Sequence, residues 1–306
     1  MTVELLKNRR VDAAIVRFHP MLLMHVAALR LARVPVLLSM QGVPDSVYAA
    51  SRRRLLLRPV IDWAIRSVAS LADYIVVPHI GVSETASELY GISADAVLPN
   101  GFAPPSSLDE ALVRRTSDEI VRRGVPYVFF AGALAAWQGI PTIIAATEEP
   151  DWPSDVRLVI AGGGQLEEEV VRASQESDNI LYVGVLSPSE VKAYVQHAIL
   201  TLSVKDRVDE TKNGVTPFKL MESLTYGTPV MVSALPGQVD IVTSTGAGVV
   251  VEPGDSTGVA RSLRCLVEEP KSELGRLRDN ASRSHDVFAW EKHSSTLHSA
   301  LKAAGL

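Results

Sequence analysis

The stretch that decides the fold is residues 211–230, Thr-Lys-Asn-Gly-Val-Thr-Pro-Phe-Lys-Leu-Met-Glu-Ser-Leu-Thr-Tyr-Gly-Thr-Pro-Val. It lies between two short apolar runs, residues 199–203 and 229–232, which have the length and composition of buried strands. The stretch itself has the signals of a short helix. We therefore predict a strand, a loop, a helix and a second strand of one parallel sheet.

The ends of this helix are marked by three residues. Thr216 suits the N-cap, and Pro217 suits the first helical position, where no backbone N–H is needed. Gly227 suits the left-handed residue after the helix. The predicted helix is about ten residues long, and its buried side is expected to consist of Phe218, Leu220, Met221 and Leu224.

Lys219 and Glu222 lie three residues apart, on one face of this helix and near its start. Free N–H groups and the helix dipole favour an anion there, and a lysine adds charge that a phosphate can use. A carboxylate one turn later can accept hydrogen bonds from the two hydroxyls of a ribose. The alternative is an ordinary exposed ion pair, worth a few tenths of a kcal/mol.

Strands recur between helical patterns along most of the chain, which predicts an α/β fold with parallel sheets. The predicted strands are 11–16, 36–40, 74–77, 96–98, 127–130, 156–161, 180–183, 199–203, 229–232 and 248–251. A Gly-, Pro- and Ser-containing break between 100 and 124 marks a domain boundary. Four strands precede it and six follow, so we expect the first domain to lack its opening units.

Composition indicates an ordinary globular protein of two domains: 306 residues, 47% hydrophobic and 21% charged. The single cysteine, Cys265, excludes an internal disulfide, fits a reducing compartment and is expected in the core. Net charge is −5, but residues 1–60 hold ten Lys and Arg against three Asp and Glu. Neither a secretory signal nor a membrane span is visible.

Three further loops follow predicted strands. Small residues at 131–140 include Gly132 and end at Gln138 and Gly139, where a helix is expected to begin. Gly162 and Gly163 follow the next strand, and the run 182–187 contains Gly184 and Val185, whose backbone could border a flat base. The alternative for each loop is a plain structural turn. No metal-ligand spacing, Walker motif or Gly-x-Gly-x-x-Gly motif is present.

Residues 46–68 combine five arginines with Tyr48, Trp63 and several aliphatic residues. This mixture suits a helix lying on an anionic bilayer surface. The alternative is a normal helix that covers a sheet, and Pro59, which interrupts the periodicity of the segment, argues against contact with a bilayer. We expect no nucleic-acid partner.

Taken together, these segments resemble the GT-B glycosyltransferases, in particular the large group 1 (family 4-like) family of retaining bacterial nucleotide-sugar transferases. The matching segments span nearly the whole chain and occur in the family's order: 98–102, 130–132 with 137–140, 158–164, 216–230, 246–255 and 288–291. The resemblance implies two Rossmann-like domains, 1–105 on the acceptor side and 106–287 on the donor side. Residues 288–306 would form a helix returning to the first domain.

The resemblance implies transfer of a sugar from a UDP- or GDP-sugar to a glycan or lipid-linked acceptor, with retention and without a metal or other cofactor. Such an enzyme works in the cytoplasm or at the inner face of the membrane. Catalytic candidates are Lys219, Glu222 and Arg207; donor-binding candidates are Gly132, Gln138, Gly139, Gly162, Gly163, Gly184, Val185, Thr216, Pro217, Phe218, Lys219 and Glu222; acceptor-side candidates are Arg17, Gln41, Gly42 and Asn100.

Three departures from the family pattern leave alternatives open. Gly214 stands where many members carry a first glutamate, and Ala133 and Gln138 stand where many carry an arginine and a lysine. Arg207, Lys205 or Lys212 would then supply the missing charge. The chain also begins after the family's first strand and glycine-rich loop, so a shortened, inactive nucleotide- or partner-binding module is the second hypothesis. A sugar-nucleotide epimerase is a third.

Overall fold

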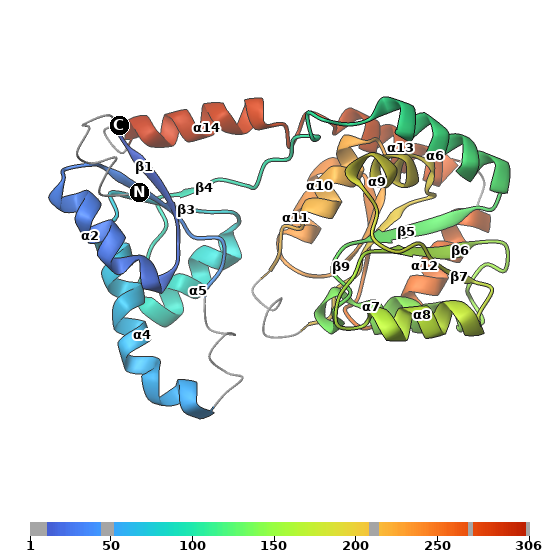
Figure 1. Ribbon diagram of the computed structural model, residues 1–306, viewed down its shortest axis with the longest axis horizontal. Coiled ribbons are helices and arrows are strands. Elements are labelled where there is room, and N and C mark those ends of the chain that lie inside the picture. The colour runs from blue at the N-terminus through green and yellow to red at the C-terminus, as the bar shows by residue number, and fades with distance from the viewer. Residues whose placement is uncertain (1–10, 44–51, 208–213, 269–271, 304–306) are drawn as a thin grey trace. The chain divides into compact units, whose positions relative to one another are not determined.

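The computed structural model describes residues 11–43, 52–207, 214–268 and 272–303, and it contains all ten predicted strands (Figure 1). The chain divides into two compact units, Met1–Asn100 with Glu291–Leu306, and Gly101–Trp290. The first unit holds a four-stranded parallel sheet and the second a six-stranded one. The predicted α/β fold with two parallel sheets is therefore confirmed.

The first unit builds its sheet in simple chain order. Its strands are β1 (Ala14–Arg17), β2 (Val36–Ser39), β3 (Tyr74–Val77) and β4 (Ala96–Val97). One face packs against α2 (Leu23–Leu31), α4 (Arg52–Ser70) and α5 (Ile80–Tyr90), with Val36, Leu38 and Val77 in the core. The other face, through Leu37 and Val76, packs against α14 (Trp290–Ala303).

The second unit has the strand order β10-β9-β8-β5-β6-β7, so the order reverses between β5 and β8. Its strands are β5 (Tyr127–Ala131), β6 (Arg157–Ala161), β7 (Ile180–Tyr182), β8 (Thr201–Ser203), β9 (Val230–Ser233) and β10 (Gly248–Val251). From β5 the chain continues to β6, and from β8 it continues to β9 on the opposite side. In open parallel sheets, ligands bind outside the carboxyl ends of the strands at such a reversal.

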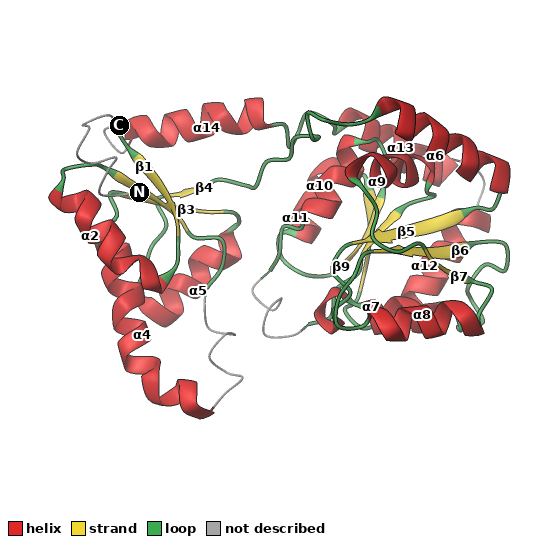
Figure 2. Cartoon of the chain, viewed as in Figure 1, coloured by secondary structure: helices red, strands yellow, loops and turns green. Residues whose placement is uncertain are grey.

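Helices cover both faces of this sheet (Figure 2). One face, with Val128, Phe130 and Ile160, packs against α7 (Ile140–Ala146), α8 (Glu167–Glu176) and α12 (Ser256–Glu268). The opposite face is covered by α6 (Glu110–Arg123), α9 (Pro188–His197), α10 (Phe218–Thr225) and α11 (Gln238–Thr245). Helix α13 (Ser272–Arg283) contributes to both clusters of core residues, with Leu277 in the first and Ala281 in the second. No helix in the described part of the chain is both long and apolar enough to cross a membrane.

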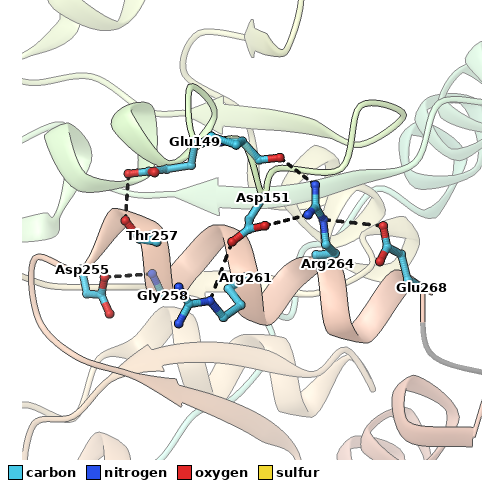
Figure 3. Close-up of polar contacts among 9 residues, drawn as sticks. Glu149, Asp151, Asp255, Thr257, Gly258, Arg261, Arg264 and Glu268 are labelled. Atoms are coloured by element: carbon cyan, nitrogen blue, oxygen red, sulfur yellow. Dashed lines mark hydrogen bonds and ion pairs between the residues drawn. The ribbon is translucent and has the colours of Figure 1, made fainter.

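Polar contacts hold α12 against the segment that follows α7 (Figure 3). The Glu149 carboxylate accepts hydrogen bonds from the hydroxyls of Ser256 and Thr257 at 2.7 and 3.1 Å. The Arg264 guanidinium pairs with Asp151 at 2.6 Å and donates to the Pro150 carbonyl at 2.6 Å. These contacts join elements more than 100 residues apart in sequence, so they fix α12 on the sheet.

Three local expectations were wrong. Helix α10 begins at Phe218 rather than Pro217, because Pro217 has extended backbone angles and is itself the N-cap, one residue after Thr216. Phe218 is 60% exposed rather than buried, since it opens the helix beyond the end of the sheet. Cys265 is exposed, because the buried side of α12 is formed by Val259, Ala260, Leu263 and Leu266.

Candidate donor site at the carboxyl edge of the six-stranded sheet

The loops after β5 and β8 bring two polar side chains together at the reversal of strand order. Gln138 ends the short 3-10 helix η2 (Ala136–Gln138) after β5, and Lys205 lies two residues after β8. The Lys205 ammonium donates to the Gln138 amide oxygen at 2.5 Å and lies 4.7 Å from the centre of the Trp137 ring. Only 2% of Lys205 is exposed, which is rare for a lysine.

Helix α10 adds a second ammonium group to the same oxygen. Lys219, in the first turn of α10, donates to the Gln138 amide oxygen at 3.2 Å, and its ammonium lies 3.6 Å from the centre of the Phe130 ring. Within the described part of the chain, neither Lys205 nor Lys219 forms an ion pair with a carboxylate. Two lysine amino groups thus share one neutral acceptor and retain N–H donors for a ligand.

Burial makes this pair of charges costly. It lowers the pKa of Lys205 to about 8. Burial, and then the charge of Lys205, lower the pKa of Lys219 well below its usual value, whereas the Glu222 carboxylate opposes that change. A buried cation is disfavoured unless it is paired, and like charges nearby add to the cost. An anion placed between the two ammonium groups would relieve both effects.

Glu222 lies one turn further along α10 and is half-buried. Burial raises the pKa of its carboxyl to about 7, and the charge of Lys219 acts in the opposite direction. The predicted closeness of Lys219 and Glu222 is therefore present, but in a sheltered site rather than on an exposed face. A carboxyl group in such a setting can accept hydrogen bonds from ligand hydroxyls with little competition from water.

Two glycines allow the close approach of these loops. At Gly139, φ is +74° and an added Cβ would lie 2.1 Å from the Val204 carbonyl oxygen, so the loop after β5 can pass the end of β8 only with glycine. At Gly132, φ is +151° and an added Cβ would lie 2.8 Å from the Lys219 ammonium nitrogen. The sequence thus keeps the space around Gln138 and Lys219 free of side chains.

A recess of about 310 Å³ adjoins this cluster at the same edge of the sheet. Its walls are small or apolar residues of three strand-end loops, among them Gly132, Gly162, Gly163 and Val185. The Gly162 backbone N–H donates to the Gly184 carbonyl at 2.8 Å, which joins two of these loops. The recess has no polar side chain among its lining residues, as suits an aromatic ring.

The remaining predicted site residues have different positions. Thr216, Pro217 and the exposed Phe218 lead into α10 and lie at the same edge. Arg207 is exposed and donates to the Ala234 carbonyl at 3.3 Å. Lys205, rather than Arg207, is the cation that the structure brings to Gln138, and Lys212 lies outside the described residues.

The acceptor-side candidates lie in the first unit. Arg17 is the exposed last residue of β1, and Gln41 follows β2, where its amide donates to the Ser39 hydroxyl at 2.8 Å. Gly42 comes next, and Asn100 lies in the segment after β4. Arg17, Gln41 and Gly42 therefore share the carboxyl edge of the four-stranded sheet.

The described residues contain no cluster of three or more His, Cys, Asp or Glu that could hold a metal ion. The described donor-side cluster offers ammonium groups, an amide and one carboxyl group instead. Such a set is suited to binding an anion that carries hydroxyl groups nearby.

Comparison with solved structures identifies the fold class. HepE of Anabaena in complex with UDP aligns with a TM-score of 0.75 at 16% identity, over 99% of this chain and 82% of that chain. Two parallel-sheet α/β domains are characteristic of the GT-B fold, which confirms the expectation from sequence.

Sequence comparison gives the family. Residues 115–284, more than half of the chain, match the group 1 glycosyl transferases, and the chain belongs to this family. The 2-deoxystreptamine glucosyltransferase of Streptomyces kanamyceticus is 23% identical over 83% of this chain and 69% of its own length. The 2-deoxystreptamine N-acetyl-D-glucosaminyltransferase of Niallia circulans is 26% identical over 63% of this chain and 48% of its own length. The chain is thus a group 1 glycosyltransferase by sequence.

Proposed function

We propose that this protein transfers a hexosyl group from a UDP- or GDP-sugar to a glycan or lipid-linked acceptor, with retention of anomeric configuration. The observation that carries the donor assignment is the pair of buried ammonium groups, Lys205 and Lys219, on the single amide oxygen of Gln138. A diphosphate is the anion that suits this arrangement, because it offers several oxygens to two cations at once.

In this proposal the lysines bind the donor and stabilise the leaving nucleoside diphosphate. Negative charge grows on the leaving oxygen as the glycosidic bond breaks, and preorganised donors in a sheltered site lower the energy of that state. Lys205 and Lys219 are held by Gln138 before the ligand arrives, so little reorganisation is needed. The proposal thus assigns charge neutralisation to side chains rather than to a metal.

The neighbouring features accommodate the rest of the donor. Glu222 accepts hydrogen bonds from the two ribose hydroxyls, and the recess beside Gly132 and Val185 takes the base. A carboxylate is the better acceptor, so ribose binding favours the ionised form of Glu222 and lowers the pKa from its value of about 7. Donor affinity should therefore fall as the pH drops below 7.

Relatives inform the choice of substrates for a test. HepE was solved with UDP and also with UDP-glucose, the latter structure aligning with a TM-score of 0.74 at 15% identity over 99% of this chain and 82% of that chain. The two sequence relatives are named for 2-deoxystreptamine. A panel of acceptors should include this compound.

The test measures release of nucleoside diphosphate from UDP- and GDP-sugars, with and without acceptors. Glu222→Ala should lower turnover by at least about tenfold, corresponding to about 1.4 kcal/mol. Glu252→Ala, which alters an exposed carboxylate after β10, should leave it unchanged. Unchanged turnover in Glu222→Ala removes Glu222 from the mechanism.

The same experiment separates the proposal from a nucleotide-binding module without catalysis. Gly214 stands where the family resemblance places a glutamate, and this supports the second candidate. Nucleotide binding by calorimetry without turnover for any donor and acceptor favours that candidate. Turnover by the 306-residue chain excludes it. Conversion of a UDP-sugar without acceptor would instead indicate an epimerase.

The first unit supports a further part of the proposal, contact with the anionic inner face of a cytoplasmic membrane. Met21, in the short 3-10 helix just before α2, is 81% exposed, and Met24, in the first turn of α2, is 79% exposed. Val60 and Trp63 of the adjoining α4 are 60% and 61% exposed. Residues 46–51 of the segment predicted to touch the bilayer lie outside the described part. Exposed apolar side chains in a basic region suit such a surface.

Sedimentation with vesicles tests this contact. Vesicles of phosphatidylcholine with phosphatidylglycerol should bind the protein, and the double variant Met24→Ser, Trp63→Ser should lower the bound fraction severalfold. Val121→Ser, which changes a valine 62% exposed on α6, is the matched control. Equal binding by all three proteins would contradict the assignment.

A further inference from the structure

A second cavity lies in the six-stranded unit, at the opposite edge of the sheet from the donor site. It has a volume of about 370 Å³ and is a partly open recess lined by the C-terminal part of α6, by α9 and by the starts of β5 and β6. Cavities of roughly 300–1,000 Å³ are of the size that holds small molecules. The donor recess lies at the carboxyl ends of the same strands, so the two are distinct.

The walls of this cavity are apolar and fixed by the register of the sheet. Tyr127 pairs with Arg157, and Val159 pairs with Leu181, so these four side chains line one face of β5, β6 and β7. Helix α9 closes the cavity with Tyr194, whose ring stacks on Phe129 at a centroid distance of 5.3 Å. The Tyr127 hydroxyl donates to the Tyr194 carbonyl at 2.7 Å, so it is occupied within the wall.

Two arginines give the cavity its charge. Arg123, in the last turn of α6, already pairs with the Glu119 carboxylate at 2.7 Å. Arg157, the half-buried first residue of β6, has no carboxylate partner among the residues that the structure describes. A guanidinium stays charged at all ordinary pH values. An apolar cavity thus carries an unpaired cation.

These features are complementary to one kind of molecule. An apolar chain gains free energy by displacing water from the walls, and an anionic end group satisfies the guanidinium with two parallel hydrogen bonds. A fully polar anion would leave the walls wet, and a neutral hydrocarbon would leave Arg157 unpaired. The amino edge of the sheet therefore offers more than an unspecific apolar surface.

We propose that the cavity between α6, α9 and the amino ends of β5–β7 binds a small amphiphilic anion, an aliphatic chain ending in a carboxylate, with Arg157 as its charge partner. This assignment is independent of the donor site and holds whichever nucleotide the protein uses. The ligand would lie along Val159 and Leu181, with its carboxylate at the rim.

Calorimetry with sodium decanoate below its micelle concentration tests this proposal, beside decanol and acetate as probes that lack the charge or the chain. Decanoate should bind saturably at one site and more tightly than either. Arg157→Gln should weaken decanoate binding by about tenfold while leaving decanol binding unchanged. Arg114→Gln, on the exposed side of α6, should leave decanoate binding unchanged.

A second variant tests the cavity itself. Leu181 is a half-buried residue of β7 that lines the cavity, so Leu181→Trp places a larger side chain there and should abolish decanoate binding. The circular dichroism spectrum should show that the fold of this variant persists. Should Leu181→Trp perturb the fold, the Arg157→Gln comparison decides. Absence of saturable binding, equal affinity for decanoate and decanol, or unchanged decanoate affinity in Arg157→Gln would each overturn the proposal.

Discussion

The substitution Lys205→Met separates two effects of the buried ammonium group, its cost to the stability of the fold and its contribution to nucleotide binding. Methionine has nearly the same length and suits an apolar site, and Lys205 is only 2% exposed. Burial lowers the pKa of Lys205 from 10.5 to about 8. At 1.36 kcal/mol per pKa unit, keeping this lysine charged at pH 7 costs about 3 kcal/mol.

Removing the buried charge should recover this free energy. Part of the recovered stability is offset by the loss of the hydrogen bond from Lys205 to Gln138, which is worth about 1 kcal/mol. The Gln138 oxygen keeps its bond from Lys219 and is not left unsatisfied. The variant should therefore unfold with a free energy about 2 kcal/mol higher than that of the wild type at pH 7. Affinity for UDP or GDP should fall at least about tenfold in the same protein.

The stability difference between the variant and the wild type should depend on pH in a definite direction. Because the pKa of Lys205 is lower in the folded state, the folded wild type loses this proton above pH 8, while the unfolded chain keeps it up to about pH 10.5. The wild type therefore gains stability across this window, and the advantage of the variant disappears. Below pH 8 the advantage should be constant.

Urea denaturation followed by tryptophan fluorescence measures the effect, since Trp137 lies directly beside Lys205. Hydrogen exchange of the β8 amides assigns the change to the six-stranded unit. Lys302→Met, at an exposed lysine of α14, is the control and should change neither stability nor affinity. A variant that is less stable than the wild type at every pH would refute the reasoning.

Other predictions concern the same unit. Burial raises the pKa of Glu222 to about 7, so the wild type should lose up to about 3 kcal/mol of stability between pH 4.5 and 7 relative to Glu222→Gln. Thermal unfolding of both proteins at pH 4.5 and 8 measures this loss, and a pH-independent difference would contradict it. Gly139→Ala should lower the free energy of unfolding by more than about 2 kcal/mol, because φ is left-handed and the added Cβ would also clash with backbone atoms. Gly184→Ala, where φ is +72° and the space is open, should lower it by only about 1 kcal/mol. Equal losses in chemical denaturation would argue against the close approach at Gly139. Arg264→Ala should lower the unfolding free energy by about 1 kcal/mol without changing nucleotide affinity, because the ion pair of Arg264 with Asp151 fixes α12 and is not part of the donor site. A changed affinity in calorimetry would show that α12 and the donor site are coupled.

The strand pattern could be predicted from sequence because several strands, among them β5, β6 and β9, are apolar runs that are almost wholly buried. Runs such as 127–130 and 158–161 leave few other solutions in a chain with regular helical segments between them. Helix ends were less predictable. Pro217 satisfies the sequence rule for the first helical position, yet the loop before it holds it in extended conformation.

The candidate site was predictable only in part. Lys219 and Glu222 could be paired from their spacing alone, because both lie on one short helix. Lys205 and Gln138 are 67 residues apart, and they meet only because β5 and β8 are neighbours in a sheet whose order reverses there. Lys205 could be named only as one of three alternatives, and the signal that distinguishes it is its position two residues after a buried strand.

The most direct test of the donor site is a crystal structure of the protein with UDP, or with GDP if UDP does not bind. Oxygens of the diphosphate should lie within hydrogen-bond distance of the side-chain nitrogens of both Lys205 and Lys219, and the ribose hydroxyls should lie at the Glu222 carboxylate. A diphosphate bound elsewhere, with Gln138 still the sole partner of the two lysines, would contradict it.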